Sequence, residues 1–144
     1  MKKAFWMIFV LTLFIKLEAQ KVDDNRIVVT LDDTTNIHKR VRQAVVFTDF
    51  IVREDSKPDS LITYAERIFN STIFVIAKVV IIGNKVEISG AYGLGYQDFW
   101  GFPDWPRGYN EVIYYKESES WKIIRKIALK LDGKLSFYKV KNKK

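Results

Sequence analysis

The sequence predicts an α+β domain in which two N-terminal helices pack on one curved antiparallel sheet of about five strands. Apolar residues recur at helical spacing up to about residue 69, and the period changes to two from residue 73 onward. The later segments follow one another as hairpins, without the alternation of strand and helix that marks a parallel sheet. A run of helices followed by a run of strands therefore predicts helices gathered on one face of a single sheet.

Residues 1–19 have the anatomy of a secretory signal peptide. A basic start precedes twelve apolar residues that end at Ile15, and Ala19 occupies the expected cleavage position. The alternative is a transmembrane anchor, but as a helix the apolar run would span about 18 Å, against about 30 Å for a bilayer core. We expect an exported bacterial protein, periplasmic or secreted, with residues 20–144 as one α+β domain and no integral membrane segment after cleavage.

Charge and cysteine content narrow the chemistry. The chain has no cysteine, which excludes disulfides, thiolate metal sites and cysteine catalysis. Without the three lysines and one glutamate of the leader, the formal net charge falls from +7 to +5. Outside the cytoplasm a basic domain meets acidic proteins, anionic glycans and membrane surfaces, so we expect a protein or glycan partner and no nucleic acid. The order Gly90-x-x-Gly93-x-Gly95 is not that of a dinucleotide fingerprint, and we expect no cofactor.

The chain should begin with a short strand and a helix. Arg26–Leu31 is rich in β-branched residues, which predicts the strand. Asp32–Asn36 then offers capping side chains for a helix from about 35 to 53. The residues at helical spacing are Ile37, Val41, Ala44, Val45, Thr48 and Val52. The run Val45–Val52 is also rich in strand formers, so a strand there stays an alternative.

A second helix is predicted from about 59 to 69, with Asp59 or Ser60 as its cap. The residues that form its apolar stripe are Leu61, Tyr64, Ala65, Ile68 and Phe69.

A hairpin should follow from 73 to 92, because Gly83-Asn84 is a two-residue turn signal between apolar segments. Pairing across this turn puts Val79 opposite Ile88 and Ile81 opposite Val86. One face of the hairpin is then apolar and should pack on the helices: Val75, Ala77, Val79, Ile81, Val86, Ile88 and Tyr92.

Two more strands are predicted at Glu111–Lys116 and Trp121–Leu129, joined by a polar turn. Lysines alternate with apolar residues in the second strand, where Arg125 breaks the apolar face.

The last turn should hold three residues, with Gly133 in the left-handed conformation, because this length pairs Leu129 with Leu135 on one face. We expect the chain from Lys139 onward to fray into solvent.

Two helices, an antiparallel sheet and a late segment beginning Trp121-Lys-Ile-Ile-Arg together resemble small exported domains of the NTF2-like and cystatin-like α+β roll type. The residues that carry the likeness are Lys78 to Ala91 and Val112 to Ile127. The resemblance implies a helix lying across a strongly bent sheet, and a small-ligand or enzymatic pocket between helices and sheet as an alternative function. It implies no particular site residue.

The segment from Gly90 to Tyr109 is the most unusual part of the chain, with seven aromatic residues, five glycines and two prolines. It could be a platform that stacks on sugar rings or fills pockets of a protein partner, or a satellite core over one end of the sheet. Long connections of this kind tend to be functional. The candidate partner-binding residues are Tyr96, Phe99, Trp100, Phe102, Trp105, Arg107 and Tyr109.

The remaining polar residues predict no catalytic residue and no metal site. Asp98 and Asp104 could form an acid–base pair, but carboxylates beside Gly and Pro are ordinary turn formers. His38 is the only histidine, and we expect it on an exposed helix surface. The lysines from 116 to 144 form either a basic stripe or a solvated sheet face whose charges discourage aggregation. The function predicted is a non-enzymatic exported binding domain that uses the aromatic loop.

Overall fold

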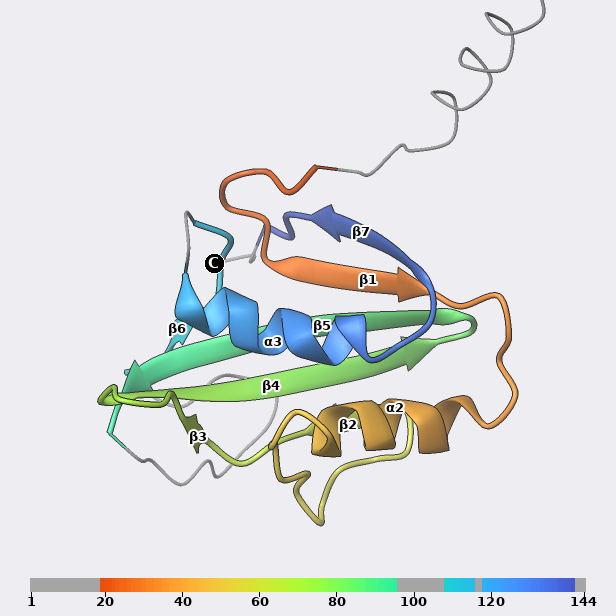
Figure 1. Cartoon of the computed structure of the whole chain (residues 1–144), viewed down its shortest axis with the longest axis horizontal. Coiled ribbons are helices and arrows are strands. Elements are labelled where there is room, and N and C mark those ends of the chain that lie inside the picture. The colour runs from red at the N-terminus through yellow and green to blue at the C-terminus, as the bar shows by residue number, and fades with distance from the viewer. Residues whose placement is uncertain (1–18, 96–107, 116–117, 142–144) are drawn as a thin grey trace, which may run out of the picture.

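One seven-stranded antiparallel sheet organises the chain, and two helices cover one of its faces (Figure 1). The computed structural model describes residues 19–95, 108–115 and 118–141. The strands are β1 (Arg26–Thr30), β2 (Ser60–Ile62), β3 (Glu66–Arg67), β4 (Ile73–Ile82), β5 (Lys85–Leu94), β6 (Asn110–Glu111) and β7 (Lys134–Tyr138), and the helices are α2 (Ile37–Val46) and α3 (Glu119–Leu129). The order across the sheet is β2-β4-β5-β1-β7, with β3 also pairing with β4 and β6 with β5.

The predicted architecture of two N-terminal helices on about five strands is wrong. The sheet has seven strands, and α3 follows six of them in the chain. Of the two described helices, α2 is in the N-terminal half, after β1, and α3 is in the C-terminal half. The two errors that produced the prediction are a helix assigned where β2 and β3 form, and a strand assigned where α3 forms.

The predicted helix at 59–69 is replaced by two short strands because pairing with β4 satisfies the backbone of this segment. Leu61 lies opposite Val79, and both Leu61 and its neighbour Ile62 are buried, on opposite faces of the sheet. A helix would have turned one of them outward. Phe69, which the helical stripe placed inside, is 89% exposed.

The predicted strand at 121–129 is a helix. The hydroxyl of Ser118 caps its first turn by accepting a hydrogen bond from the backbone N–H of Trp121 at 3.4 Å. The buried residues recur at helical spacing: Ser120, Trp121, Ile124, Ile127 and Ala128. Because α3 cannot pair with β7, the predicted contact between Leu129 and Leu135 does not form, and β7 pairs with β1 instead.

The β4–β5 hairpin confirms the predicted turn and register. Val79 lies opposite Ile88 and Ile81 opposite Val86, across the turn at Gly83-Asn84. The apolar face of the hairpin packs under the helices, with Ile81 and Tyr92 partly buried at its margin. Gly90 allows α3 to approach the sheet, because a Cβ there would lie 2.9 Å from Cγ2 of Ile124.

The helix predicted at 35–53 forms only over α2. The chain turns at Phe47 to Asp49, and Asp49 takes a left-handed conformation with φ 68°. Val52 then forms an isolated bridge with Thr63, so the alternative strand in this region is correct for that residue alone.

The strand predicted at Glu111–Lys116 is present as strand only at its start, in β6. Beyond it the chain continues beside the residues that lead into β1. The N–H of Asp23 donates to the carbonyl of Tyr114 at 3.0 Å, and the N–H of Tyr114 donates to the carbonyl of Asp24 at 2.7 Å. These bonds bring segments near both ends of the domain to one corner.

The core lies between the helices and one face of the sheet. Its largest buried side chain is Trp121. The centroid of the Trp121 ring lies 5.7 Å from that of Tyr114 and 6.2 Å from that of Phe137. None of the described helices is long and apolar enough to cross a membrane. The predicted signal peptide falls almost wholly on residues 1–18, outside the described part of the chain.

Gly133 supplies a stability test. It is not left-handed, contrary to the prediction, but a Cβ there would lie 2.6 Å from the backbone oxygen of Thr30. Backbone cannot move aside as a flexible side chain can, so Gly133→Ala should lower the free energy of unfolding by about 1–3 kcal/mol in urea titrations. The exposed neighbour provides the control: Asp132→Ala should change it by less than about 0.5 kcal/mol. Equal effects of the two substitutions would contradict this role of Gly133.

Candidate functional site

The backbone of β7 faces β1 on one side, and within the described part of the chain no strand pairs with its other side. In an antiparallel strand the N–H and C=O of one residue point to the same side, and those of the next residue point to the opposite side. Leu31, just after β1, donates its N–H to the carbonyl of Asn84, just before β5, at 2.9 Å. The odd residues of β1 therefore bond to β5, and its even residues bond to β7.

This alternation decides which groups of β7 are free. Ser136 and Tyr138 lie opposite the even residues Val28 and Arg26, so their backbone groups point toward β1. The backbone groups of Leu135 and Phe137 consequently point outward. Among the described residues no strand pairs with this side of β7. We call these outward N–H and C=O groups the β7 edge.

The opposite edge of the sheet is closed by the chain itself. In β2 the residues with outward backbone groups are Ser60 and Ile62, and those of Ile62 are both bonded. The N–H of Ile62 donates to Ser56 Oγ at 3.0 Å, and the carbonyl of Ile62 accepts from the N–H of Arg53 at 2.9 Å. The N–H of Ser60 donates to the carbonyl of Lys57 at 3.1 Å. The segment before β2 thus satisfies that edge, which makes the open β7 edge distinctive.

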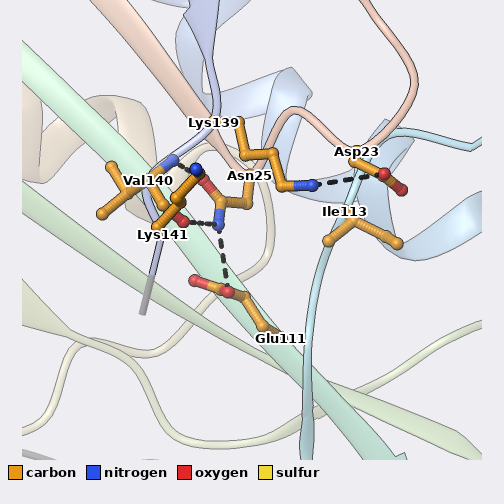
Figure 2. A pocket seen from close by; sticks show the side chains of 7 residues that line it. All are labelled: Asp23, Asn25, Glu111, Ile113, Lys139, Val140 and Lys141. Atoms are coloured by element: carbon orange, nitrogen blue, oxygen red, sulfur yellow. Dashed lines mark hydrogen bonds and ion pairs between the residues drawn. The ribbon is translucent and has the colours of Figure 1, made fainter. Parts of the chain in front are cut away.

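A hollow of about 590 Å³ lies at the end of β7, open to solvent (Figure 2). Three segments far apart in the sequence form its walls: the approach to β1, the exit from β6 and the chain after β7. The lining residues are Asp23, Asn25, Glu111, Ile113, Lys139, Val140 and Lys141. We call it the corner hollow; it combines two lysines, two carboxylates and two aliphatic side chains.

Asn25 fixes the chain after β7 in place. Its side-chain amide donates to the carbonyl of Val140 at 2.9 Å, and its amide oxygen accepts from the N–H of Val140 at 2.7 Å. Lys139 Nζ lies 3.3 Å from Asp23 Oδ2. The prediction that the chain frays from Lys139 onward is therefore wrong for Lys139 and Val140.

Arg26 pairs with two carboxylates at the hollow. Its Nε lies 3.2 Å from Glu87 Oε1, and its Nη1 lies 2.5 Å from Glu111 Oε1. Glu111 also accepts from Asn25 Nδ2 at 3.1 Å, so each of its oxygens has a donor. The Arg26 and Glu111 side chains are only 14% and 15% exposed, and at this depth an ion pair is screened less than at an open surface.

Tyr138 extends this network across β1. Its hydroxyl donates to Glu87, which also receives Arg26. Partial burial, together with the hydrogen bond to the Glu87 carboxylate and its negative charge, raises the pKa of Tyr138 to about 12 by favouring the neutral phenol. The Glu87 carboxylate on β5 is therefore bound both by Arg26 on β1 and by the neutral Tyr138 hydroxyl on β7.

Six of the seven predicted binding residues lie outside the described part of the chain: Tyr96, Phe99, Trp100, Phe102, Trp105 and Arg107. The seventh, Tyr109, has a structural contact. Its hydroxyl donates to the carbonyl of Gly95 at 3.0 Å, and its ring packs on Gly93, where a Cβ would lie 2.5 Å from the ring. Tyr109 thus anchors the returning chain to the end of β5.

Two of the other polar residues considered in the sequence, His38 and Arg125, lie in the described part of the chain. His38 is exposed on α2 as predicted, with Nδ1 3.1 Å from the carbonyl oxygen of Pro58. Arg125 lies on α3, where its Nε is buried without a hydrogen-bond partner. Asp98 and Asp104 lie outside the described residues. Within residues 19–95, 108–115 and 118–141, no group of three or more histidine or carboxylate side chains is placed to hold a metal ion.

Sequence reasoning missed the corner hollow. Its residues come from three segments, each more than twenty positions from the next in the sequence. Because α3 was predicted as a strand, the order of the strands that brings these segments together could not be predicted. The available signals were the lysines at 139 and 141 and the polar Asp23–Asn25 before the first strand.

Comparison with known proteins finds no match: no family model, no curated protein and no solved structure is similar to the chain. The resemblance to NTF2-like and cystatin-like domains therefore stays a prediction.

The Tyr138–Glu87 contact predicts a difference in alkaline stability. A folded-state pKa of about 12, against 10.0 for the ordinary group, means that the unfolded chain loses the phenol proton first as pH rises. The stabilisation is complete below pH 10.0 and disappears as pH rises toward 12. Urea titrations should show wild type losing more stability over this range than Tyr138→Phe, which keeps the ring but cannot ionise. Parallel curves for the two proteins would contradict the assignment.

Proposed function

We propose that the chain is an exported, non-enzymatic domain that binds a partner protein by accepting an extended segment at the β7 edge. The leader-like residues 1–19 support export, and the open edge supports the mode of binding. Strand addition uses main-chain hydrogen bonds for affinity and alternate side chains for specificity. The observation that carries the proposal is the contrast between the two sheet edges: β2 is sealed by its own chain, whereas the outward groups of Leu135 and Phe137 have no described partner.

The geometry of β7 suits an incoming strand. It is five residues long, close to the usual length of a strand, and its pairing with β1 holds it extended. The side chains of Leu135 and Phe137 pack against the core, so the edge is a fixed template. A partner segment therefore meets an ordered row of donors and acceptors, which lowers the entropic cost of association.

The aromatic loop forms the second part of the proposal. We propose that Phe99, Trp100, Phe102, Trp105 and Arg107 add contacts to the same partner, because large aromatic side chains carry much of the energy of protein interfaces. A glycan stacked on these rings is the alternative ligand for the loop.

The edge can be tested by semisynthesis, since β7 lies close to the C-terminus. Random linear peptides displayed on phage serve as the probe, and selected binders are measured against the folded domain. N-methylation of the Phe137 amide, which points outward, should weaken them at least about tenfold while leaving unfolding unchanged.

N-methylation of Ser136 is the matched control, because its amide faces β1 and the loss should appear in stability. Selected peptides that bind the Phe137 N-methyl protein as tightly as the unmodified protein would rule out addition at this edge.

The loop has its own test. The pair Trp100→Ala and Trp105→Ala should weaken binding of a cross-linked envelope partner by more than about tenfold while far-UV circular dichroism and the unfolding midpoint stay unchanged. Trp121→Ala is the contrasting variant, since this buried tryptophan should affect stability and not recognition. Full retention of the partner by the double variant would show that the loop is not the site.

A further inference from the structure

We propose that the segment accepted at the β7 edge is acidic, and that its carboxylates pair with Lys134, Lys139 and Lys141. The inference rests on the proposed function, because it specifies the chemistry of the strand that this edge receives. Lys134 begins β7 and Lys139 follows its last residue, so an added strand about 17 Å long would meet a lysine at each end.

The carboxylates in this corner are already paired within the protein. Glu111 is held by Arg26 and Asn25, and Glu87 by Arg26 and Tyr138. Each of these carboxylates already accepts two donors from the protein, which fixes its position and occupies part of its hydrogen-bonding capacity. Arg26 cancels one of these two negative charges, and the neutral Asn25 and Tyr138 donors hold both carboxylates in place.

The three lysines have fewer ion-pair partners than these two carboxylates. Among the described residues Lys134 and Lys141 form no ion pair, and Lys139 pairs only with Asp23, a contact whose two side chains are about half exposed. An exposed pair of this kind contributes little to stability, so a ligand carboxylate can replace it at little cost. Together with the net charge of +5 for residues 20–144, this favours an acidic partner.

Apolar side chains beside the lysines sharpen the description of the segment. Ile113 and Tyr115 follow β6 and are 37% and 62% exposed, and the Ile113 side chain lines the corner hollow with Val140 (Figure 2). Because residues of a strand alternate between its two sides, a segment with acidic and apolar residues in alternation would match both features.

An extended acidic segment is favoured over a second copy of this chain. A second copy would bring the same lysines and the same positive charge to the interface, and like charges oppose association. An edge that carries lysines is also a common protection against pairing with identical edges.

The test compares two doubly substituted proteins that lose the same charge. Random linear peptides displayed on phage are selected against the full domain. With wild type, the bound peptides should be enriched in Asp and Glu over the starting library, and their affinity should fall as salt is raised. Lys139→Gln with Lys141→Gln should weaken these peptides about threefold to tenfold and remove the enrichment in a fresh selection.

The control, Lys39→Gln with Lys57→Gln, carries its substitutions on α2 and near the sealed β2 edge and should leave affinity within about twofold. Peptides that require the Phe137 amide but are neutral or basic would overturn the acidic assignment and leave strand addition standing. Peptides that ignore both the Phe137 amide and the lysines would overturn the proposed function itself.

Discussion

The backbone ladder between β4 and β5 is the constraint on which the rest of the structure depends. These two strands of ten residues pair along their whole length, and every other strand of the sheet except β7 pairs with one of them. Once that register is set, β1 must pair with β5 through its odd residues and with β7 through its even ones. The orientation of the free groups on β7 follows from this alternation.

The same constraint gathers the polar residues of the corner. β1 lies between β5 and β7, so Arg26 reaches Glu87 on one neighbour while Tyr138 on the other neighbour reaches the same carboxylate. β6 pairs with β5 beyond the part of β5 that pairs with β1, and it brings Glu111 into contact with Arg26. A charged site therefore arises beside a strand edge because each charged residue occupies a fixed place in one hydrogen-bonded sheet.

The central hairpin could be predicted from the sequence, whereas the helices and edges could not be placed correctly. The two-residue turn signal Gly83-Asn84 specifies one register for the strands around it, and the structure has that register. Two segments were assigned the wrong period. Residues 59–69 match a helical stripe by chance, but pairing with β4 buries Leu61 and Ile62 on opposite faces. Residues 121–129 fit both periods, and the capping hydroxyl of Ser118 was the local signal that favours a helix.

The candidate site was less predictable than the fold. The aromatic residues stand out in composition, yet most of them lie outside the described residues, and the one that is described, Tyr109, is engaged with Gly93 and Gly95. The β7 edge and the corner hollow depend on which strands neighbour each other, and that order was lost when α3 was predicted as a strand. Local patterns do not specify the pairing of β7 with the distant β1.

Amide hydrogen exchange along β7 in the free protein tests the central claim most directly, since it reports which backbone groups have partners. The account predicts alternation: the amides of Ser136 and Tyr138 should be protected, and those of Leu135 and Phe137 should exchange rapidly. On the opposite edge, the amide of Ile62 should be protected through its bond to Ser56. Protection at every residue of β7 would mean that its outer side is already covered, and would contradict the account.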